Sequence, residues 1–205
     1  MTLDLGTLTD GELAALTMAG RQQAFAEIMK RHRASIYRLT RGHVGDPEET
    51  LDLVQETFIA AYRALGDYDQ NRPMRAWLSR IAINKCRDWA RRRMVRRFLV
   101  SISPGRADAV LQVLDDAPVL DDAAAAREEL ELLWAAVAAL PRSLKEPLIL
   151  RTVEGLSQSE TAKVLGISEK AVESRLYRAR AKLGPLRQSL VAESRSTPLP
   201  PPSDG

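Results

Sequence analysis

The spacing of three small or apolar residues in the C-terminal half constrains the fold of this chain more than any other feature. Ala162, Gly166 and Val172 stand four and six positions apart in QSETAKVLGISEKAVESRLYRA, residues 158–179. A helix-turn-helix needs a small residue where its helices approach, a turn residue that tolerates positive φ, and an apolar residue on the second helix. Ser168 can cap that second helix. The segment is therefore predicted to form a helix-turn-helix.

The second helix of this motif offers a face of long or polar side chains that can reach base edges and phosphates. They are Glu169, Lys170, Glu173, Ser174, Tyr177 and Arg178. Leu165 and Ile167 flank the turn as expected core residues. The alternative is a helical hairpin in a protein that does not bind DNA. The spacing, the cap and the basic residues that follow favour DNA binding.

The N-terminal half has the periodicity of amphipathic helices. Between residues 21 and 41, apolar residues recur at spacings of three and four. A break is expected from Gly42 to Pro47, with Asp46 as the N-cap of the next helix and Pro47 at its first position. That next helix is expected to turn one apolar face inward, namely Leu51, Val54, Phe58, Ala61 and Leu65.

A third helix is predicted after the turn-rich loop GDYDQNRP, residues 66–73. It should run from about Met74 to Arg93 and bury apolar residues, namely Trp77, Leu78, Ile81, Cys86 and Trp89. No alternating apolar pattern of useful length predicts a strand. The two tryptophans are expected in the core instead of acting as DNA wedges.

Charge alternates along the chain. Residues 71–97 contain ten basic residues and one acid, a local charge of +9. Residues 98–133 contain two basic residues and eight acids, a local charge of −6, and residues 142–187 are basic again. Two cationic surfaces joined by an anionic segment suit a polyanionic partner.

These features predict an all-α fold of two small helical domains joined by a flexible acidic linker. The expected divisions are a first domain over 1–97, the linker over 98–126, a second domain over 127–184 and a disordered Pro-rich tail over 185–205. The second helical block should start near Asp122 and be stopped by Gly184 and Pro185.

Several classes of protein are disfavoured by composition. Cys86 is the only cysteine, and His32 and His43 have no nearby ligand pattern, so no disulfide, metal site or cofactor is expected. No phosphate-binding glycine loop or nucleophile–base set supports an enzyme. The sequence has no signal-peptide pattern and no apolar run long enough to span a bilayer, so a cytoplasmic protein is expected.

Two further segments carry candidate functional residues. In the basic helix WLSRIAINKCRDWARRRMVRR, Asn84 can read a base edge bidentately, whereas its arginines can hold phosphate or only face solvent. In DLVQETFIAAYRAL, residues 52–65, Ile59 stands among polar side chains on the outward face. This strip suits protein docking, although periodicity alone favours ordinary surface.

Together the segments DLVQETFIAAYRAL, RPMRAWLSRIAINKCRDWARRR and LSQSETAKVLGISEKAVESRLYRARAKL resemble the extracytoplasmic-function sigma factors. They occur in the order of sigma region 2 and sigma region 4, and the resemblance covers roughly residues 19–183. It implies a non-enzymatic subunit that binds core RNA polymerase and promoter DNA. Whether an anti-sigma factor also binds the chain is left open.

The resemblance also implies roles for individual residues. Polymerase binding falls on Asp52, Gln55, Glu56 and Ile59. Binding of the −10 element falls on the loop of residues 66–75 and the basic helix, at Tyr68, Arg75, Arg80, Asn84, Lys85, Arg87 and Arg91. Binding of the −35 element falls on Ser168, Lys170, Glu173, Ser174, Tyr177 and Arg178.

Two positions depart from the family's pattern. Glu173 stands where many relatives carry a basic residue, so their −35 preference cannot be transferred. Met74 stands where an aromatic residue often precedes the motif's tryptophan, and Tyr68 can stack on a base or belong to the core. The main alternative function is a stand-alone helix-turn-helix regulator, which would dimerise on half-sites.

Overall fold

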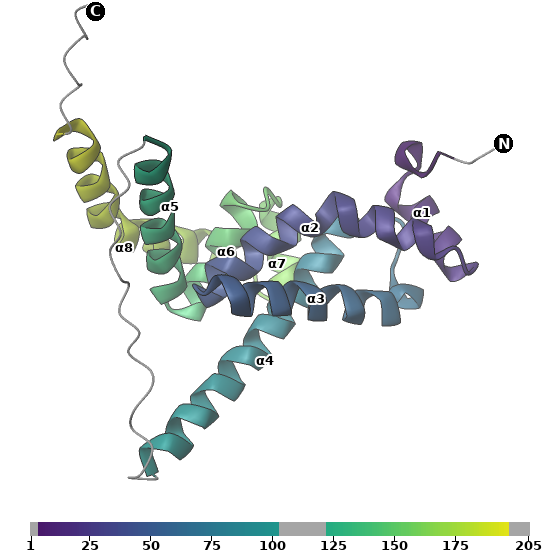
Figure 1. Ribbon diagram of the computed structural model, residues 1–205, viewed down its shortest axis with the longest axis horizontal. Coiled ribbons are helices and arrows are strands. Elements are labelled where there is room, and N and C mark those ends of the chain that lie inside the picture. The colour runs from purple at the N-terminus through teal and green to yellow at the C-terminus, as the bar shows by residue number, and fades with distance from the viewer. Residues whose placement is uncertain (1–3, 103–121, 197–205) are drawn as a thin grey trace, which may run out of the picture.

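The structure, a computed structural model, describes residues 4–102 and 122–196, and every regular element in these ranges is a helix (Figure 1). In chain order the elements are η1 (Leu5–Thr7), α1 (Asp10–Met18), α2 (Gln22–Val44), α3 (Pro47–Arg63), η2 (Leu65–Asp67), α4 (Met74–Ile102), α5 (Asp122–Ala139), α6 (Arg142–Thr152), α7 (Gln158–Leu165) and α8 (Glu169–Ser196). The all-α prediction is confirmed. None of the helices within these ranges is both long and apolar enough to cross a membrane.

Helix α2 is the central element of the N-terminal half, residues 4–102, because it packs against α1, α3 and α4. The core face of α2 consists of Phe25, Ile28, Ile36 and Leu39, as the periodicity predicts. The facing helices contribute Val54, Phe58, Ala61, Leu78, Ala82 and Ile83. Burying one such large apolar side chain is worth about 1.5–3 kcal/mol, so this stripe holds the bundle together.

The junction between α2 and α3 differs from the predicted break. Helix α2 continues through Gly42 to Val44 and ends at Gly45, whose φ of 80° is left-handed. Asp46 then caps α3 and Pro47 takes its first position, as predicted. The predicted break at Gly42 is wrong. This glycine lies inside α2 at a site of close helix packing, and the chain turns at Gly45 instead.

The C-terminal half, residues 122–196, packs directly on the N-terminal half. Helices α5 and α6 lie against α2, and α7 lies against α4. A Cβ atom at Gly42 would lie 2.7 Å from Cδ1 of Ile149 and 3.2 Å from the Trp134 ring. The missing side chain therefore lets α6 approach α2 closely. Both predicted helical units are present, and their buried apolar residues form one continuous core.

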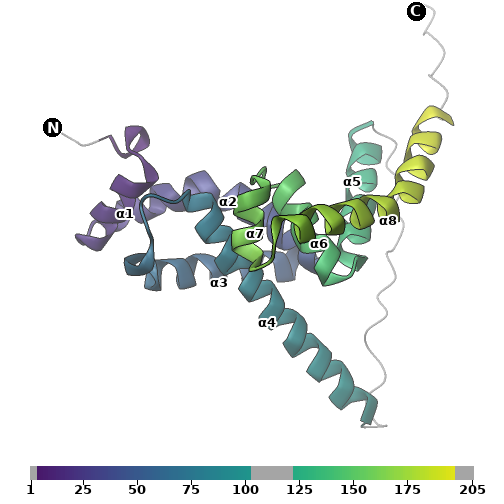
Figure 2. The same cartoon turned by 180° about the vertical axis from the view of Figure 1, so that it is seen from behind.

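Helix α4 is longer than its sequence pattern predicts. It continues past Arg93 to Ile102, and its last turns extend away from the other helices (Figures 1 and 2). Arginine and methionine lose little side-chain freedom in a helix, so such a segment can stay helical with little packing. Residues 98–102 and 122–126 of the expected linker are helical, and 103–121 lie outside the described residues.

The predicted stop of the last helix is also wrong. Helix α8 continues through Gly184 and Pro185 to Ser196. Proline lacks an N–H and its ring crowds the carbonyl four residues earlier, so in a helix interior it can produce a kink. Figure 2 shows α8 changing direction before its last, yellow turns. The expected Pro-rich tail thus begins within a helix, and its residues 197–205 lie outside the described residues.

His43 is buried near the contact between the two halves. Its Nδ1 lies 2.9 Å from the carbonyl oxygen of Leu39, which only accepts, so Nδ1 carries the proton. Its Nε2 has no hydrogen-bond partner among the described residues. The pKa of His43 is lowered from 6.5 to about 4, mainly by burial and to a smaller extent by Lys145 and Arg87, while Leu39 and Glu146 oppose the shift.

The free energy of unfolding should therefore fall as the pH is lowered from 6.5 toward about 4. In this window the unfolded chain takes up a proton on His43 that the folded chain excludes, an effect of about 3 kcal/mol when complete. Urea denaturation at several pH values would measure it. His43→Asn, whose amide can still donate to Leu39, should show a flatter dependence. Parallel curves for the two proteins would contradict this role.

Candidate nucleic-acid interface

The predicted helix-turn-helix is confirmed in α7 and α8. Gly166 ends α7 in the left-handed conformation, with φ of 68°. Ala162 and Val172 are buried where the two helices meet. The hydroxyl oxygen of Ser168 accepts a hydrogen bond of 3.2 Å from the backbone N–H of Ala171, which caps α8. Each residue therefore has the local role that its spacing predicts.

Helix α8 turns one polar face to the solvent. Val172, Leu176 and Ala179 are buried along its opposite side. The exposed side chains, called here the reading face, are Ser168, Glu169, Lys170, Glu173, Ser174, Tyr177 and Arg178. Tyr177 is 76% exposed, which leaves its ring available to a partner. The predicted reading face is thus intact and unobstructed.

Glu173 forms no hydrogen bond or ion pair with another described residue. Lys170 and Tyr177 are the intrahelical partners that the spacing allows, yet neither forms an ion pair or hydrogen bond with it. The nearby Arg178 instead reaches back to Ser174, with Nε 3.4 Å from the carbonyl oxygen. An exposed, unpaired carboxylate on this face can accept a hydrogen bond from the amino group of cytosine.

The predicted −10 residues on α4 divide between two sides of the helix. Asn84, Arg87 and Arg91 line a cleft between α4 and the C-terminal half. The other wall of this cleft includes Arg142, Ser143, Glu146, Leu165 and Arg175. Lys85 instead points toward α3, with Nζ 3.6 Å from Oε2 of Glu56. Lys85 therefore lies on another side of α4 from Asn84, Arg87 and Arg91, in keeping with basic residues that spread around the helix.

Two buried carboxylates of the C-terminal half pair with predicted DNA-binding arginines. Arg87 donates hydrogen bonds of 2.8 and 2.7 Å to the two oxygens of Glu146. Arg75 Nε lies 3.3 Å from Oε2 of Glu154, which also accepts from Ser35. Glu146 is 3% exposed and Glu154 is 0% exposed. Hydrogen bonding to Glu146 raises the pKa of Arg87, so this guanidinium is held charged.

Neither carboxylate was predicted from the sequence. A signal exists for Glu146, which stands three and four positions before Ile149 and Leu150. This spacing places it on the apolar and hence buried face of α6, where a carboxylate needs a partner. For Glu154, which follows that helix next to Gly155, no comparable pattern is available.

The candidate polymerase surface, called here the α3 strip, consists of Asp52, Gln55, Glu56 and Ile59. Asp52, Gln55 and Ile59 are exposed, as predicted. Glu56 is partly buried, because Lys85 and Arg92 of α4 each approach it to 3.6 Å. Leu51, predicted to point inward, is 44% exposed and lies beside the strip. The prediction for Leu51 is wrong because α3 packs through the side that carries Val54 and Phe58.

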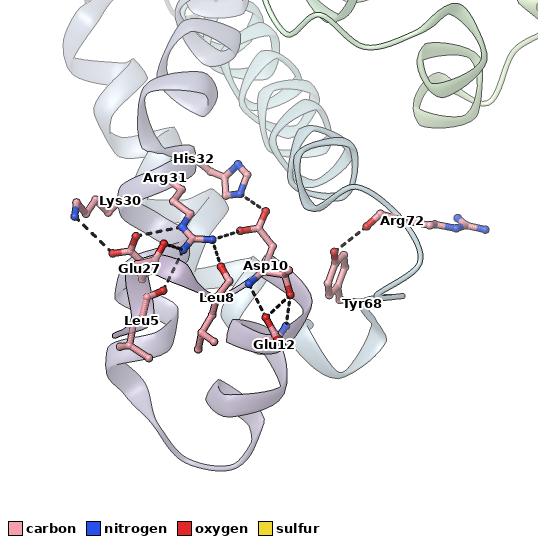
Figure 3. A network of polar contacts seen from close by, with 12 residues as sticks. Leu5, Leu8, Asp10, Glu12, Glu27, Lys30, Arg31, His32, Tyr68 and Arg72 are labelled. Carbon is pink, nitrogen blue, oxygen red and sulfur yellow. Dashed lines mark hydrogen bonds and ion pairs between the residues drawn. The ribbon is translucent and has the colours of Figure 1, made fainter. Parts of the chain in front are cut away.

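The loop before α4 closes on itself through Tyr68. Its hydroxyl donates a 2.8 Å hydrogen bond to the carbonyl oxygen of Arg72 (Figure 3), and its ring centroid lies 5.2 Å from that of Trp77. Burial raises the pKa of Tyr68. The ring therefore has a packing role in this structure, and stacking on a base remains a prediction.

An arginine in α2 binds the segment that precedes α1. This segment lies next to the loop. Arg31 donates hydrogen bonds of 2.7–3.1 Å to the carbonyl oxygens of Leu5, Gly6 and Leu8. Asp10 lies between Arg31 and His32 and contacts both, at 3.2 and 2.9 Å (Figure 3). Helix α1 is thereby held beside the loop. Within the described part of the chain, no three His, Cys, Asp or Glu residues are grouped closely enough to hold a metal ion.

Comparison with known families matches both halves of the chain. The model of Sigma-70 region 2 matches residues 28–96, and the model of Sigma-70, region 4 matches residues 130–183. The first match covers most of α2, all of α3 and most of α4, and the second includes the helix-turn-helix. Together the matches span more than half of the sequence.

Individual proteins agree with these matches. The chain is 42% identical to the RNA polymerase sigma factor CnrH of Cupriavidus metallidurans over 179 residues, 86% of this chain and 93% of that protein. It is 30% identical to the ECF RNA polymerase sigma factor SigW of Bacillus subtilis, over 80% of this chain and 89% of that protein. The solved complex of CnrH with the cytosolic domain of CnrY has a TM-score of 0.64 at 35% identity, covering 88% of this chain and 97% of CnrH.

The turn of the helix-turn-helix provides a direct stability test. Nothing lies within 4 Å of a Cβ built on Gly166 or on Gly184, but only Gly166 has a positive φ. Gly166→Ala should destabilise the protein by about 1–2 kcal/mol through backbone strain alone. Gly184→Ala, the matched control within α8, should stabilise it by about 0.5–1 kcal/mol. Thermal unfolding would compare them, and equal shifts would contradict the strained turn.

Proposed function

The chain belongs to the sigma-70 family of RNA polymerase sigma factors, and on this premise we propose how its surfaces divide promoter recognition. As a factor of the extracytoplasmic-function type, it directs core polymerase to chosen promoters and promotes opening of the −10 element. The observation that carries the assignment is the presence of regions 2 and 4, in order, on one chain. A stand-alone helix-turn-helix regulator would account for the second region alone, and no comparison supports it.

We assign core-polymerase binding to the α3 strip. An exposed aliphatic side chain, Ile59, surrounded by Asp52 and Gln55 has the composition of a protein-docking surface, with an apolar centre and a polar rim. Glu56 contributes less free charge, because Lys85 and Arg92 partly neutralise it. The outer side of α3 is accessible without any rearrangement of the described helices.

We assign the −10 element to the loop of residues 66–75 and the adjoining face of α4. Extruding a base costs a few kcal/mol, which contacts to that base must offset. The exposed amide of Asn84 can supply a bidentate base contact, and the exposed Arg80 and Arg91 can hold phosphates. Further proposed contacts come from Tyr68, Arg75 and Arg87, with Lys85 adding positive potential from the side of α3.

We assign the −35 element to the reading face of α8. The N-terminal turns of the second helix of a helix-turn-helix enter the major groove. In α8 these turns carry Lys170, Glu173 and Ser174, all exposed, and Tyr177 and Arg178 follow one turn later. Ser168, which caps α8, would lie at the edge of the DNA major groove. Base reading here would combine hydrogen-bond donors with the unpaired carboxylate of Glu173 as an acceptor.

Sigma factors are DNA-binding initiation factors. We propose that this chain likewise performs no catalysis itself and leaves RNA synthesis to the polymerase. We also propose that it acts in the cytoplasm.

A protein partner is also proposed. CnrH was solved in complex with the cytosolic domain of CnrY. RpoE of Bartonella quintana, which shares the fold, was solved with the anti-sigma factor NepR. We infer that an anti-sigma factor binds this chain as well.

Polymerase binding should depend on the α3 strip. Asp52→Arg combined with Ile59→Glu should abolish co-elution with core polymerase, because it reverses a rim charge and places a carboxylate at the apolar centre. Glu128→Arg, on the exposed surface of α5, is a matched control for a charge reversal. Circular dichroism would verify that all variants remain helical. Unchanged co-elution of the double variant would remove the strip from the interface.

The −35 preference should depend on Glu173. Glu173→Arg should shift the preferred base at one −35 position away from cytosine, because arginine donates to guanine where glutamate accepts from cytosine. It should also make log K fall more steeply with log salt, by the amount expected for about one phosphate contact, if the new side chain reaches the DNA backbone. Selection from a randomised −35 library at fixed salt would measure both proteins. A uniform gain in affinity with the same base preference would contradict base reading by Glu173.

A further inference from the structure

The loop that we assign to the −10 element is largely exposed and is shaped by hydrogen bonds between its own residues. Besides the contact from Tyr68 to Arg72, the carboxylate of Asp69 accepts a 3.0 Å hydrogen bond from the backbone N–H of Asn71. Residues 69–73 are all exposed. A loop with so little buried surface depends on the elements beside it to keep one shape.

Helix α1 is one of these elements, because it packs on η2, where the loop begins. Gly11, in the first turn of α1, faces Gln70 of the loop. A Cβ atom built on Gly11 would lie 3.5 Å from both Cβ and Oε1 of Gln70, so the loop lies directly against the helix. The pKa of Tyr68 is raised mainly by burial and to a smaller extent by the charges of Asp10 and Asp69. The Asp10 carboxylate is therefore within electrostatic reach of the Tyr68 hydroxyl.

The position of α1 is fixed by Arg31 of α2 (Figure 3). Its guanidinium donates all five of its N–H groups, four of them to residues 4–18, called here the N-terminal segment. The acceptors are the carbonyl oxygens of Leu5, Gly6 and Leu8 and the carboxylates of Asp10 and Glu27. A lysine has three donors on a single nitrogen and cannot span acceptors arranged in this way.

The N-terminal end of α1 is itself unsuited to binding DNA. Asp10 and Glu12 place two carboxylates in its first turn, and Glu12 forms a capping box with Thr9. These charges would repel a phosphate. The N-terminal segment can therefore serve DNA binding by holding the loop in place, without a DNA contact of its own.

We propose that the N-terminal segment positions the −10 loop for capture of the extruded base, with Arg31 and Gly11 as positioning residues. The proposal rests on the assignment of the loop of residues 66–75 to the −10 element. Arg31 fixes the segment on α2, and Gly11 leaves room for the loop to lie against it. A loop that already has its bound shape loses less conformational freedom when it binds a base.

Gly11→Gln separates the position of the loop from the stability of the fold. Glutamine is a better helix former than glycine, so the free energy of unfolding should not fall. The new side chain would extend into the space that Gln70 fills and displace the loop. Ala19→Gln, exposed at the other end of α1, is the matched control.

The readout is promoter opening by holoenzyme reconstituted with core polymerase. The probe is a promoter that the wild-type holoenzyme selects from a library randomised in its −35 and −10 elements. Permanganate-detected opening should fall about ten- to a hundredfold for Gly11→Gln, the loss expected when a binding group is displaced by about 1 Å. Ala19→Gln should open the promoter as well as the wild type does.

A second substitution tests whether the effect passes through the contact between α1 and the loop. Adding Gln70→Ala to Gly11→Gln should raise opening several-fold above that of Gly11→Gln alone, because it removes the side chain that the new glutamine displaces. If the second substitution gives no gain, positioning through this contact is overturned.

Arg31→Gln tests the anchor of the N-terminal segment. Opening should fall while co-elution with core polymerase and binding of duplex −35 DNA persist, because the α3 strip and the reading face lie elsewhere. Arg31→Lys, which keeps the charge, should fail to restore opening. Full opening with Arg31→Lys would overturn the role of the hydrogen bonds, and an equal loss of all three activities in Arg31→Gln would overturn a local role for Arg31.

Failure of this proposal and failure of the proposed function give different results. If the wild-type holoenzyme opens no promoter from the library, the assignment of the −10 element to region 2 is wrong. If the wild type opens the selected promoter and Gly11→Gln opens it equally well, that assignment stands and the positioning role of the N-terminal segment is overturned.

Discussion

The close approach of α6 to α2 at Gly42 decides how the two halves of this protein meet. A side chain at position 42 would begin 2.7 Å from Ile149, a residue with no exposed surface of its own. With glycine there, α6 lies flat against α2, and the segment that follows it reaches α4. In this arrangement Glu146 and Glu154 meet Arg87 and Arg75. Close packing at Gly42 therefore accompanies two buried carboxylates that would be strongly unfavourable without their partners.

The buried ion pairs offset part of the positive charge that this protein carries. Residues 71–97 carry a charge of +9, which without counter-charges would repel itself in a compact state. Carboxylates from the C-terminal half neutralise part of this charge at Arg75 and Arg87, and Glu56 of α3 neutralises another part through Lys85 and Arg92. The fork geometry of Arg87 on Glu146 is also the one by which arginine binds phosphate.

The ends of two helices show how local sequence signals can mislead. Apolar periodicity stops near Arg93, yet α4 continues to Ile102, because helix-forming residues need no core face to extend an existing helix. Gly184 and Pro185 resemble a stop signal, yet α8 passes through them to Ser196. A proline removes one hydrogen bond, and a long helix anchored by Val172, Leu176 and Ala179 upstream can tolerate that loss as a bend.

The sequence by itself determined the helices and the helix-turn-helix, because these depend on interactions among residues a few positions apart. The cap at Ser168, the left-handed turn at Gly166 and the buried Val172 are all local. Only the tertiary structure decided that Lys85 faces α3, that Gly42 receives Ile149, and that Arg75 and Arg87, which are predicted to bind DNA, meet carboxylates. Arg87 and Glu146 are 59 residues apart, and Arg75 and Glu154 are 79 apart. No periodicity spans such separations, so which charges meet depends on how the helices pack.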